Sequence, residues 1–327
     1  MNAPAASSLP DGLIGHTGFV GTALLRQTSF ARRYNSVNIG DIEGEAFGTL
    51  VCAAAPGSML EANRAPERDK AAIDGLIERL SRVTAERFVL ISSIAVLADF
   101  AGGDDESTTA YQHDLAYGRH RRALEAFVEE HFPGSLVVRL PALFGAGLRK
   151  NFLFDLLNPV PSMLAEARHA ALRTALDGDL AAWLAALYTP DAATGLRKLD
   201  RAALNADPRR AELEAALDAL GATATQFHHR DTTYQYYNTD RLWQDIGIAL
   251  EAGLTHLHLA PEPLRAADIH LRLTGRPMPE TPARLHREDM RTRHAGLWDA
   301  TGSYQFTADV TLEQLATFFA GQRGGAA

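Results

Sequence analysis

Short apolar runs alternate with amphipathic stretches through the first 140 residues. Continuous apolar runs of the buried-strand type occur at 49–53, 88–91 and 135–139. Between them, 68–83 places its apolar residues on one helical stripe, and 117–130 has a strong helical pattern. Strands that alternate with helices in this way predict an α/β fold with a doubly wound parallel sheet of the Rossmann type.

A weaker strand is predicted at 36–39, soon after a first helix that starts near Phe19. The connection from this strand to the run at 49–53 is short. One strand or helix of the usual repeat is therefore expected to be missing here.

The pattern changes after Gly145, where Ala-rich helical segments joined by loops begin. The predicted helices of this part lie at 152–157, 180–188 and 209–220, and two later ones lie near 264–273 and 312–319. Strand-like stretches return at 233–238 and 255–259, on either side of an amphipathic helix at 240–252, so the chain is expected to return to the sheet.

This pattern predicts two domains. The first would contain residues 1–145 together with a return segment at about 231–262. The second, a smaller and mostly helical lobe, would contain 146–230 and 263–327.

Three glycines follow the first short apolar run, in the order Gly15, Gly18 and Gly21. Gly15 can take a tight turn, Gly18 lets the backbone approach a phosphate, and Gly21 lets the new helix lie against the strand. The helix start offers its unpaired N–H groups to an anion. A purely structural turn is the alternative, but the strand-to-helix context favours dinucleotide binding. The cofactor contacts predicted in this turn are Gly15, Thr17, Gly18, Phe19, Val20 and Gly21.

The expected adenosine end of the site has no acidic residue at the strand end. Dinucleotide folds commonly use an Asp or Glu about 20 residues past the glycines to hold the ribose hydroxyls. Here Arg32, Arg33 and Ser36 occupy that region, which favours NADP slightly over NAD, with Ser36 as a predicted contact. Further along, the small residues Ala53, Ala54 and Ala55 follow a strand and suit a chain that passes close to an adenine or ribose, although a plain turn explains them equally well.

A tyrosine and a cation lie four residues apart at the start of a predicted helix, as Tyr117 and Arg121. This spacing places both on one helix face. A phenol with an ordinary pKa of about 10 is a poor base at neutral pH, but a neighbouring cation favours the phenolate. Ser93, at the end of the strand before this helix, could bind the substrate oxygen with which Tyr117 exchanges a proton. Ser92 beside it is a predicted cofactor contact.

Composition and charge narrow the range of partners. The formal net charge of −8 argues against a nucleic-acid or anionic-membrane surface. No apolar run approaches the roughly 20 residues that span a bilayer, and 1–8 lacks the pattern of a leader, so we expect a cytoplasmic protein without a membrane partner. The single cysteine, Cys52, is expected to be a buried, inert thiol. Only three of the 32 basic residues are lysines.

Three motifs occur in a characteristic order: the glycine turn at 15–21, the Ser pair that ends 91–93, and Tyr-x-x-x-Arg at 117–121. Together they resemble the extended short-chain dehydrogenase/reductase superfamily, and within it the NAD-dependent epimerase/dehydratase family of nucleotide-sugar enzymes. The resemblance is in register over 13–145 and extends more loosely through 236–242.

The resemblance implies a Rossmann fold with a small C-terminal substrate lobe. Ser93 would match the residue that polarises the substrate oxygen, and Tyr117 the catalytic acid/base. Arg121 stands where the family has a lysine that binds the nicotinamide ribose and lowers the pKa of the tyrosine. Arginine holds its proton and hydrogen-bonds as a planar fork, so this exchange is not conservative. Pro141 fits the family's turn beside the nicotinamide.

Lys150 and Asn151 follow at the point where the superfamily's chain enters the substrate lobe. A lysine beside an amide suits phosphate or carboxylate recognition, so both are predicted substrate contacts together with Ser93, although an exposed helix start explains them equally well. His256 and His258 share one strand face, but no third ligand has suitable spacing, so no metal is expected.

These observations lead to one principal functional hypothesis and two alternatives. The principal one is a cytoplasmic, homodimeric NAD(P)-dependent oxidoreductase or epimerase/dehydratase-like enzyme that acts on a hydroxyl or carbonyl of a small polar substrate, such as a nucleotide sugar. The first alternative is a dinucleotide-binding sensor or assembly module without redox turnover. The second is a lobe that binds substrate without any cofactor.

Overall fold

The computed structural model describes residues 8–324, so most of the N-terminal stretch used for the leader expectation lies outside the described residues. Its contacts divide the chain into two compact units. The first unit contains the residues up to Leu148, Thr233–Leu264 and Arg287–Leu315; the second contains Arg149–Thr232, Arg265–His286 and the residues from Ala316 onward. The sequence pattern places 263–327 in the second lobe, whereas the structure groups Arg287–Leu315 with the first unit.

A six-stranded parallel sheet forms the centre of the first unit, which confirms the predicted doubly wound α/β fold. Its strands, in spatial order, are β2 (Arg32–Tyr34), β1 (Gly12–Ile14), β3 (Ala46–Cys52), β4 (Thr84–Ser93), β5 (Leu136–Leu140) and β12 (His256–His258). The chain moves from β1 to β2 on one side and then crosses to β3 on the other. The sheet therefore reverses its strand order at β1 and β3, which is where open α/β sheets bind ligands.

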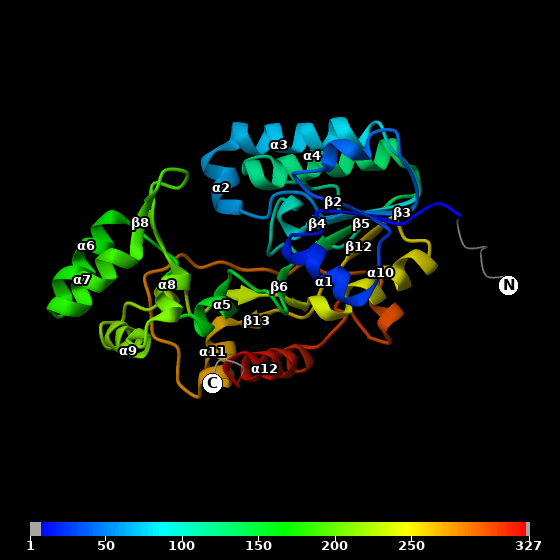
Figure 1. Ribbon diagram of the computed structural model, residues 1–327. Helices are drawn as coiled ribbons and strands as arrows, with labels where there is room; N and C mark the ends of the chain where they lie inside the picture. Colours follow the sequence, from blue (N-terminus) through cyan, green and yellow to red (C-terminus); the bar gives the residue numbers. More distant parts are fainter. Residues whose placement is uncertain (1–7, 325–327) are drawn as a thin grey trace. The chain divides into compact units, whose positions relative to one another are not determined.

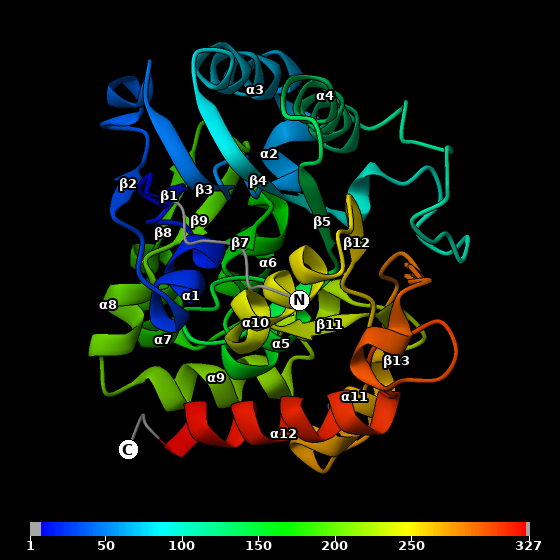
Figure 2. The same ribbon diagram turned by 90° about the vertical axis from the view of Figure 1, so that its right-hand side faces the viewer.

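Two helices cover each face of this sheet. Helices α3 (Pro66–Leu80) and α4 (Ala116–His131) pack on one face, and α1 (Phe19–Gln27) and α10 (Leu242–Glu251) on the other (Figures 1 and 2). The strands are buried on both faces, so successive side chains enter different cores.

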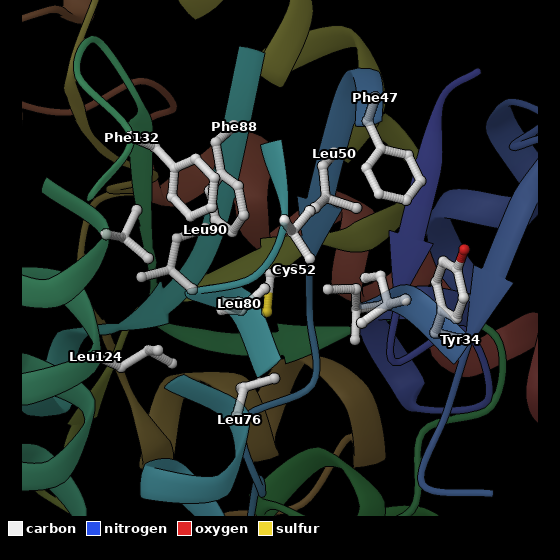
Figure 3. Packing of buried hydrophobic residues seen from close by; sticks show 14 of the residues in the cluster. Tyr34, Phe47, Leu50, Cys52, Leu76, Leu80, Phe88, Leu90, Leu124 and Phe132 are labelled. Atoms are coloured by element: carbon white, nitrogen blue, oxygen red, sulfur yellow. The ribbon is translucent and has the colours of Figure 1, made fainter. Parts of the chain in front are cut away.

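The core between the sheet and α3 and α4 has a pair of aromatic rings at each end (Figure 3). Leu50 and Cys52 of β3 point into it, while Val51 between them points into the opposite core. Phe88 of β4 stacks on Phe132 with ring centroids 4.1 Å apart (Figure 3). Cys52 is fully buried, as predicted, and this burial raises the pKa of its thiol to about 11, so it is a poor nucleophile at neutral pH.

The predicted strand at 36–39 is wrong. The strand is β2, and residues 36–38 form a turn before the short 3₁₀ helix η1 (Ile39–Ile42). β2 is the edge of the sheet and exposes both of its arginines, so it lacks the apolar run that marks a central strand. In the described part of the chain no further strand lies outside β2, and the short η1 stands where the repeat would have a longer helix, so the predicted shortening is confirmed.

Several shorter elements complete the structure around the sheet. They are α2 (Met59–Arg64), η2 (Ile94–Val96), η4 (Thr239–Arg241), η5 (Ala295–Trp298) and two strand pairs, β6 (Ala142–Phe144) with β11 (Tyr236–Asn238) and β10 (Thr233–Tyr234) with β13 (Leu264–Arg265). The predicted strand at 233–238 is therefore two short strands outside the main sheet, and only the prediction at 255–259 returns to it, as β12.

The second unit is mainly helical and has its own core. Its helices are α5 (Phe152–Leu157), α6 (Glu166–Ala175), α7 (Gly178–Leu187), α8 (Arg201–Ala206), α9 (Arg210–Ala219), η3 (Ala224–Phe227) and α11 (Ala266–Thr274). Helix α12 (Ala308–Gly324) begins in the first unit and ends in the second. A small antiparallel sheet, β7 (Met163–Leu164), β9 (Leu196–Leu199) and β8 (Tyr188–Asp191), packs with them. The predicted helices are present, whereas α6, α8 and this sheet were not predicted.

Among residues 8–324, no helix combines the length and hydropathy needed to cross a membrane. In the same part of the chain, no three His, Cys, Asp or Glu side chains gather in a way that could hold a metal ion.

Candidate functional site

The glycine turn connects β1 to α1 through tight backbone packing. Gly15 has a φ of +87°, a conformation that side-chain-bearing residues rarely adopt. A Cβ at Gly15 would lie 2.4 Å from the carbonyl oxygen of Ala53, and a Cβ at Gly21 would lie 2.1 Å from that of Gly15. Both glycines are therefore required by the approach of β1, α1 and β3 to one another.

Gly18 differs from its two neighbours because the packing does not require it. It is exposed, its φ of −76° suits any residue, and a Cβ would meet only the Gly15 carbonyl oxygen, at 3.3 Å. As the N-cap of α1 it provides no side chain to the helix start. No acceptor within residues 8–324 bonds the amides of Phe19, Val20 and Gly21.

These features fit the pyrophosphate of a dinucleotide. Unpaired amides at a helix start attract an anion, and the open space at Gly18 lets the anion approach. The turn lies at the carboxyl end of β1, next to the end of β3, where the strand order reverses. There Ala53, Ala54 and Ala55 follow β3 and are half-buried, so their small side chains border the same place.

The loop after β2, at the expected adenosine end, is held by amide side chains. Asn38 accepts a hydrogen bond from the Asn35 amide at 2.8 Å and donates one to the Arg33 carbonyl oxygen at 3.0 Å. Ser36 in this loop is exposed, and so are both arginines of β2, Arg32 and Arg33. The strand end has no carboxylate, as the sequence shows, and the contact of Ser36 with a cofactor stays a prediction.

Tyr117 and Ser93 are brought together where α4 begins beside the end of β4. A Cβ at Gly118 would lie 1.9 Å from the carbonyl oxygen of Ala95, so only glycine permits this approach of α4 to η2. Ser93 caps η2 by accepting a hydrogen bond from the Ala95 amide at 3.2 Å. The amide of Tyr117 donates to the side-chain oxygen of Asn63 in α2, at 3.0 Å, which fixes the first turn of α4 from the other side.

The Arg121 guanidinium lies over the ring of Tyr117, with its Cζ 3.8 Å from the ring centroid. It is 2% exposed and forms a bidentate ion pair with Asp69, at 2.5 Å from Nη1 to Oδ2 and 2.9 Å from Nη2 to Oδ1. Nη1 also donates to the Tyr117 carbonyl oxygen and Nη2 to that of Pro56. Nε is buried without a hydrogen-bond partner in the described chain.

This arrangement corrects the expected ionisation of Tyr117. Burial raises the pKa of the Tyr117 phenol, and this effect exceeds the lowering by the positive charge of Arg121 and by hydrogen bonding with Ser93. The negative charge of Asp69 raises the pKa further. The net direction is upward, whereas the sequence pattern predicts a lowered pKa.

Ser92, a predicted cofactor contact, points to the other face of β4. Its hydroxyl donates to Glu125 at 2.5 Å. Glu125 is fully buried and accepts hydrogen bonds from Nε and Nη2 of Arg139, whose Nη1 also donates to Nε2 of His258 at 3.1 Å. The side chain of Ser92 is therefore part of a buried polar network between α4, β5 and β12.

The remaining predicted residues come from other elements. Pro141 is buried between β5 and β6. Lys150 and Asn151 belong to the second unit, where Asn151 caps α5 by accepting a hydrogen bond from the Phe154 amide at 3.0 Å. Asn151 has a φ of +124°, a strained backbone conformation of the kind often found at functional sites. Its role in substrate binding stays a prediction.

Asp69 and Gly118 are the important residues that the sequence analysis missed. Asp69 follows the spacing of the buried residues Ile73, Leu76 and Leu80, so it is a charged residue on the apolar stripe of α3. This position was a usable signal because buried carboxylates require a partner. Gly118, inside a helix, was a second signal, since helical glycine usually has a packing reason.

Comparisons with known proteins support the fold. No protein-family model and no curated protein matches the sequence. Solved structures do match over nearly the full length. MoeE5 in complex with UDP-glucose and NAD is 14% identical and covers 97% of this chain and 99% of its own, with a TM-score of 0.58. RMD from Pseudomonas aeruginosa, complexed with NADPH, is 15% identical and covers 96% and 99%, with a TM-score of 0.57.

A third similar structure is dTDP-4-dehydrorhamnose reductase from Bacillus anthracis in complex with NADP. It is 12% identical and covers 96% of this chain and 99% of its own, with a TM-score of 0.59. At these identities the likeness shows the fold, and the fold expected from the resemblance to extended short-chain dehydrogenases/reductases is confirmed.

Proposed function

We propose that this protein is an NAD(P)-dependent enzyme of the extended short-chain dehydrogenase/reductase type that acts on a carbonyl or hydroxyl group of a nucleotide-linked sugar. The observation on which this rests is the uncapped start of α1 at Gly18, with unpaired amides beside the reversal of strand order. Three proteins of the same fold were solved with NAD or NADP(H), and one of them also with UDP-glucose.

The glycine turn and the amides of Phe19 and Val20 would hold the pyrophosphate, and Ala53 to Ala55 would border the adenosine part. The exposed Ser36 and Arg32 favour a 2′-phosphate, hence NADP. When bound, a nicotinamide supplies or accepts a hydride.

Ser93 and Tyr117 would bind the reacting oxygen of the substrate. Tyr117 exchanges a proton with this oxygen, and Ser93 orients it by a hydrogen bond. The Arg121 guanidinium, whose Cζ lies over the phenol ring, would help to hold the ring in place. Four of its five N–H groups already have protein acceptors, so its predicted contact with the nicotinamide ribose can use at most Nε–H.

Native mass spectrometry of freshly purified protein tests the cofactor and the predicted homodimer together. Turnover is tested with NADPH and NADH against UDP- and dTDP-linked sugars and their 4-keto forms. We expect turnover that falls at least 100-fold in Tyr117→Phe, because proton transfer from a positioned side chain contributes roughly 10²–10⁴-fold. Equal turnover of the wild type and Tyr117→Phe on a verified substrate would show that the assigned mechanism is wrong.

The Asp69 ion pair also supports a second candidate, a dinucleotide-binding module without redox turnover. Asp69 pairs with Arg121, the cation that stands where the resembling family has its catalytic lysine. A bound dinucleotide that is neither oxidised nor reduced with the whole substrate panel, by wild type or by Arg121→Lys, would favour the module. Clear turnover would exclude it.

A further inference from the structure

Most hydrogen-bond donors of Arg121 are already bonded to protein acceptors and not left for a ligand. A guanidinium has five N–H groups. Asp69 accepts two of them, and the carbonyl oxygens of Pro56 and Tyr117 accept two more. The fifth, on Nε, is buried without a partner in the described chain.

Asp69 is placed for this pairing by helix α3. It is 6% exposed and lies on the inward stripe of the helix. Nδ1 of His120 is a second partner, 2.8 Å from Oδ2. Burial raises the pKa of the Asp69 carboxyl, but its hydrogen bonds to Arg121 and His120 outweigh this, so its pKa lies below the usual range and the carboxylate is charged at neutral pH.

The two buried charges therefore depend on each other. Removing one partner of a buried ion pair leaves an uncompensated charge, which is strongly unfavourable. Asp69 binds the guanidinium from the α3 side with both oxygens, and this fork geometry fixes the plane of the group. The Cζ of the group lies over the Tyr117 ring, 3.8 Å from its centroid.

We propose that Asp69 is a positioning residue that binds the Arg121 guanidinium in a bidentate pair, holds it on the face of the Tyr117 ring and compensates its charge there. The inference rests on the proposed function of Tyr117 as the proton-exchanging group. A phenol beside a compensated cation keeps its proton at neutral pH, so Tyr117 donates a hydrogen bond to the substrate oxygen. A protonated phenol can give its proton to the oxygen of a carbonyl compound that is being reduced, whereas deprotonating an alcohol needs the phenolate, so the site suits a ketone or aldehyde.

The proposal can be tested without cofactor or substrate, by titrating tyrosinate absorbance in the free protein. The contribution of Tyr117 is the difference between each protein and the same protein with Tyr117→Phe. The charged groups that face this phenol are Arg121 and Asp69, with His120 bonded to Asp69. Asp69→Asn keeps the shape and one acceptor oxygen but removes the charge. Asp74→Asn is the control, because Asp74 lies on the exposed side of the same helix, paired with Lys70 at 2.6 Å.

We expect Tyr117 in the wild type to ionise at a higher pH than a free tyrosine. In Asp69→Asn the midpoint moves to lower pH, because the positive charge of Arg121 is no longer compensated, while Asp74→Asn leaves it unchanged. The proposal is overturned if Asp69→Asn and Asp74→Asn have the same midpoint, or if the wild-type phenol ionises near neutral pH.

If Asp69→Asn does not fold, as judged by circular dichroism, Arg121→Lys provides a second test. A lysine ammonium cannot form the planar fork or lie over the ring in the same way, so the positive charge that lowers the pKa of Tyr117 moves away while Asp69 stays charged, and the midpoint moves to higher pH. An unchanged midpoint in a folded Arg121→Lys protein would equally overturn the proposal. Failure to bind NAD(P)H would refute the proposed function but would leave these titrations unaffected, so the two failures are distinguishable.

Discussion

Replacing single glycines in the β1–α1 turn separates cofactor binding from folding. Gly18→Ala adds a Cβ that meets only the Gly15 carbonyl oxygen, at 3.3 Å, on a backbone whose φ of −76° accepts alanine. Its cost to stability is the exchange of one N-cap residue for a poorer one, about 1 kcal/mol or less. The added methyl group lies at the exposed start of α1, where the phosphate would approach the amides.

Loss of one hydrogen bond to a charged group costs about 1.5–3 kcal/mol, which corresponds to a roughly 10- to 150-fold weaker affinity. We therefore expect Gly18→Ala to bind NAD(P)H at least about tenfold more weakly at nearly unchanged stability. In Gly21→Ala the Cβ would lie 2.1 Å from the Gly15 carbonyl oxygen, so both stability and binding should fall. Gly75→Ala, with open space around its Cβ in α3, is the control and should change neither binding nor fold.

Fluorescence titration with NADPH and NADH measures the affinity, and urea denaturation measures the stability of the same three variants. Equal affinity of the wild type and Gly18→Ala would refute the assignment of the helix start as the phosphate site. Loss of both stability and binding in Gly18→Ala would show that this glycine is structural, as Gly15 and Gly21 are.

Three further predictions follow from the surrounding packing. Gly118→Ala would place a Cβ 1.9 Å from the Ala95 carbonyl oxygen, so α4 must move by about 1 Å or more. We expect urea denaturation to show that the free energy of unfolding falls by about 1–3 kcal/mol in this variant. Gly75→Ala, which has open space around its Cβ, should show no loss. Glu125→Gln leaves the buried Arg139 without its counter-charge and should lower the free energy of unfolding by about 3–5 kcal/mol. A loss below about 1 kcal/mol would show that this ion pair is unimportant for folding. Burial lowers the pKa of His258 below its ordinary value of 6.5, so the unfolded chain takes up a proton on this residue first as the pH falls. The free energy of unfolding should therefore keep its full contribution from His258 above pH 6.5 and decrease below it. His258→Gln should reduce the slope of a plot of unfolding free energy against pH.

The central sheet was predictable because its strands are buried on both faces. Such strands appear as continuous apolar runs, and 88–91 lies inside β4 as expected. The edge strand β2 gave no such signal, because it exposes Arg32 and Arg33 and buries only Tyr34. The strands of the small sheet in the second unit are two to four residues long, too short for a period of two to appear.

The candidate site was predictable where its chemistry depends on local spacing. Gly15, Gly18 and Gly21 occur within seven residues, and their strand-to-helix context follows from the adjoining pattern. The partner of Arg121 was not predictable in this way, because Asp69 is 52 residues away and belongs to another helix. The upward pKa shift of Tyr117 follows from burial and from this distant carboxylate, so a pattern of two residues on one helix face gives the wrong direction.

The most direct test of the account is a titration of the folded, cofactor-free protein with NADPH and NADH, followed by nicotinamide fluorescence. The account predicts saturable binding of one dinucleotide per chain, which weakens at least about tenfold in Gly18→Ala and stays unchanged in Gly75→Ala. Absence of saturable binding of either dinucleotide to the folded wild-type protein would contradict it.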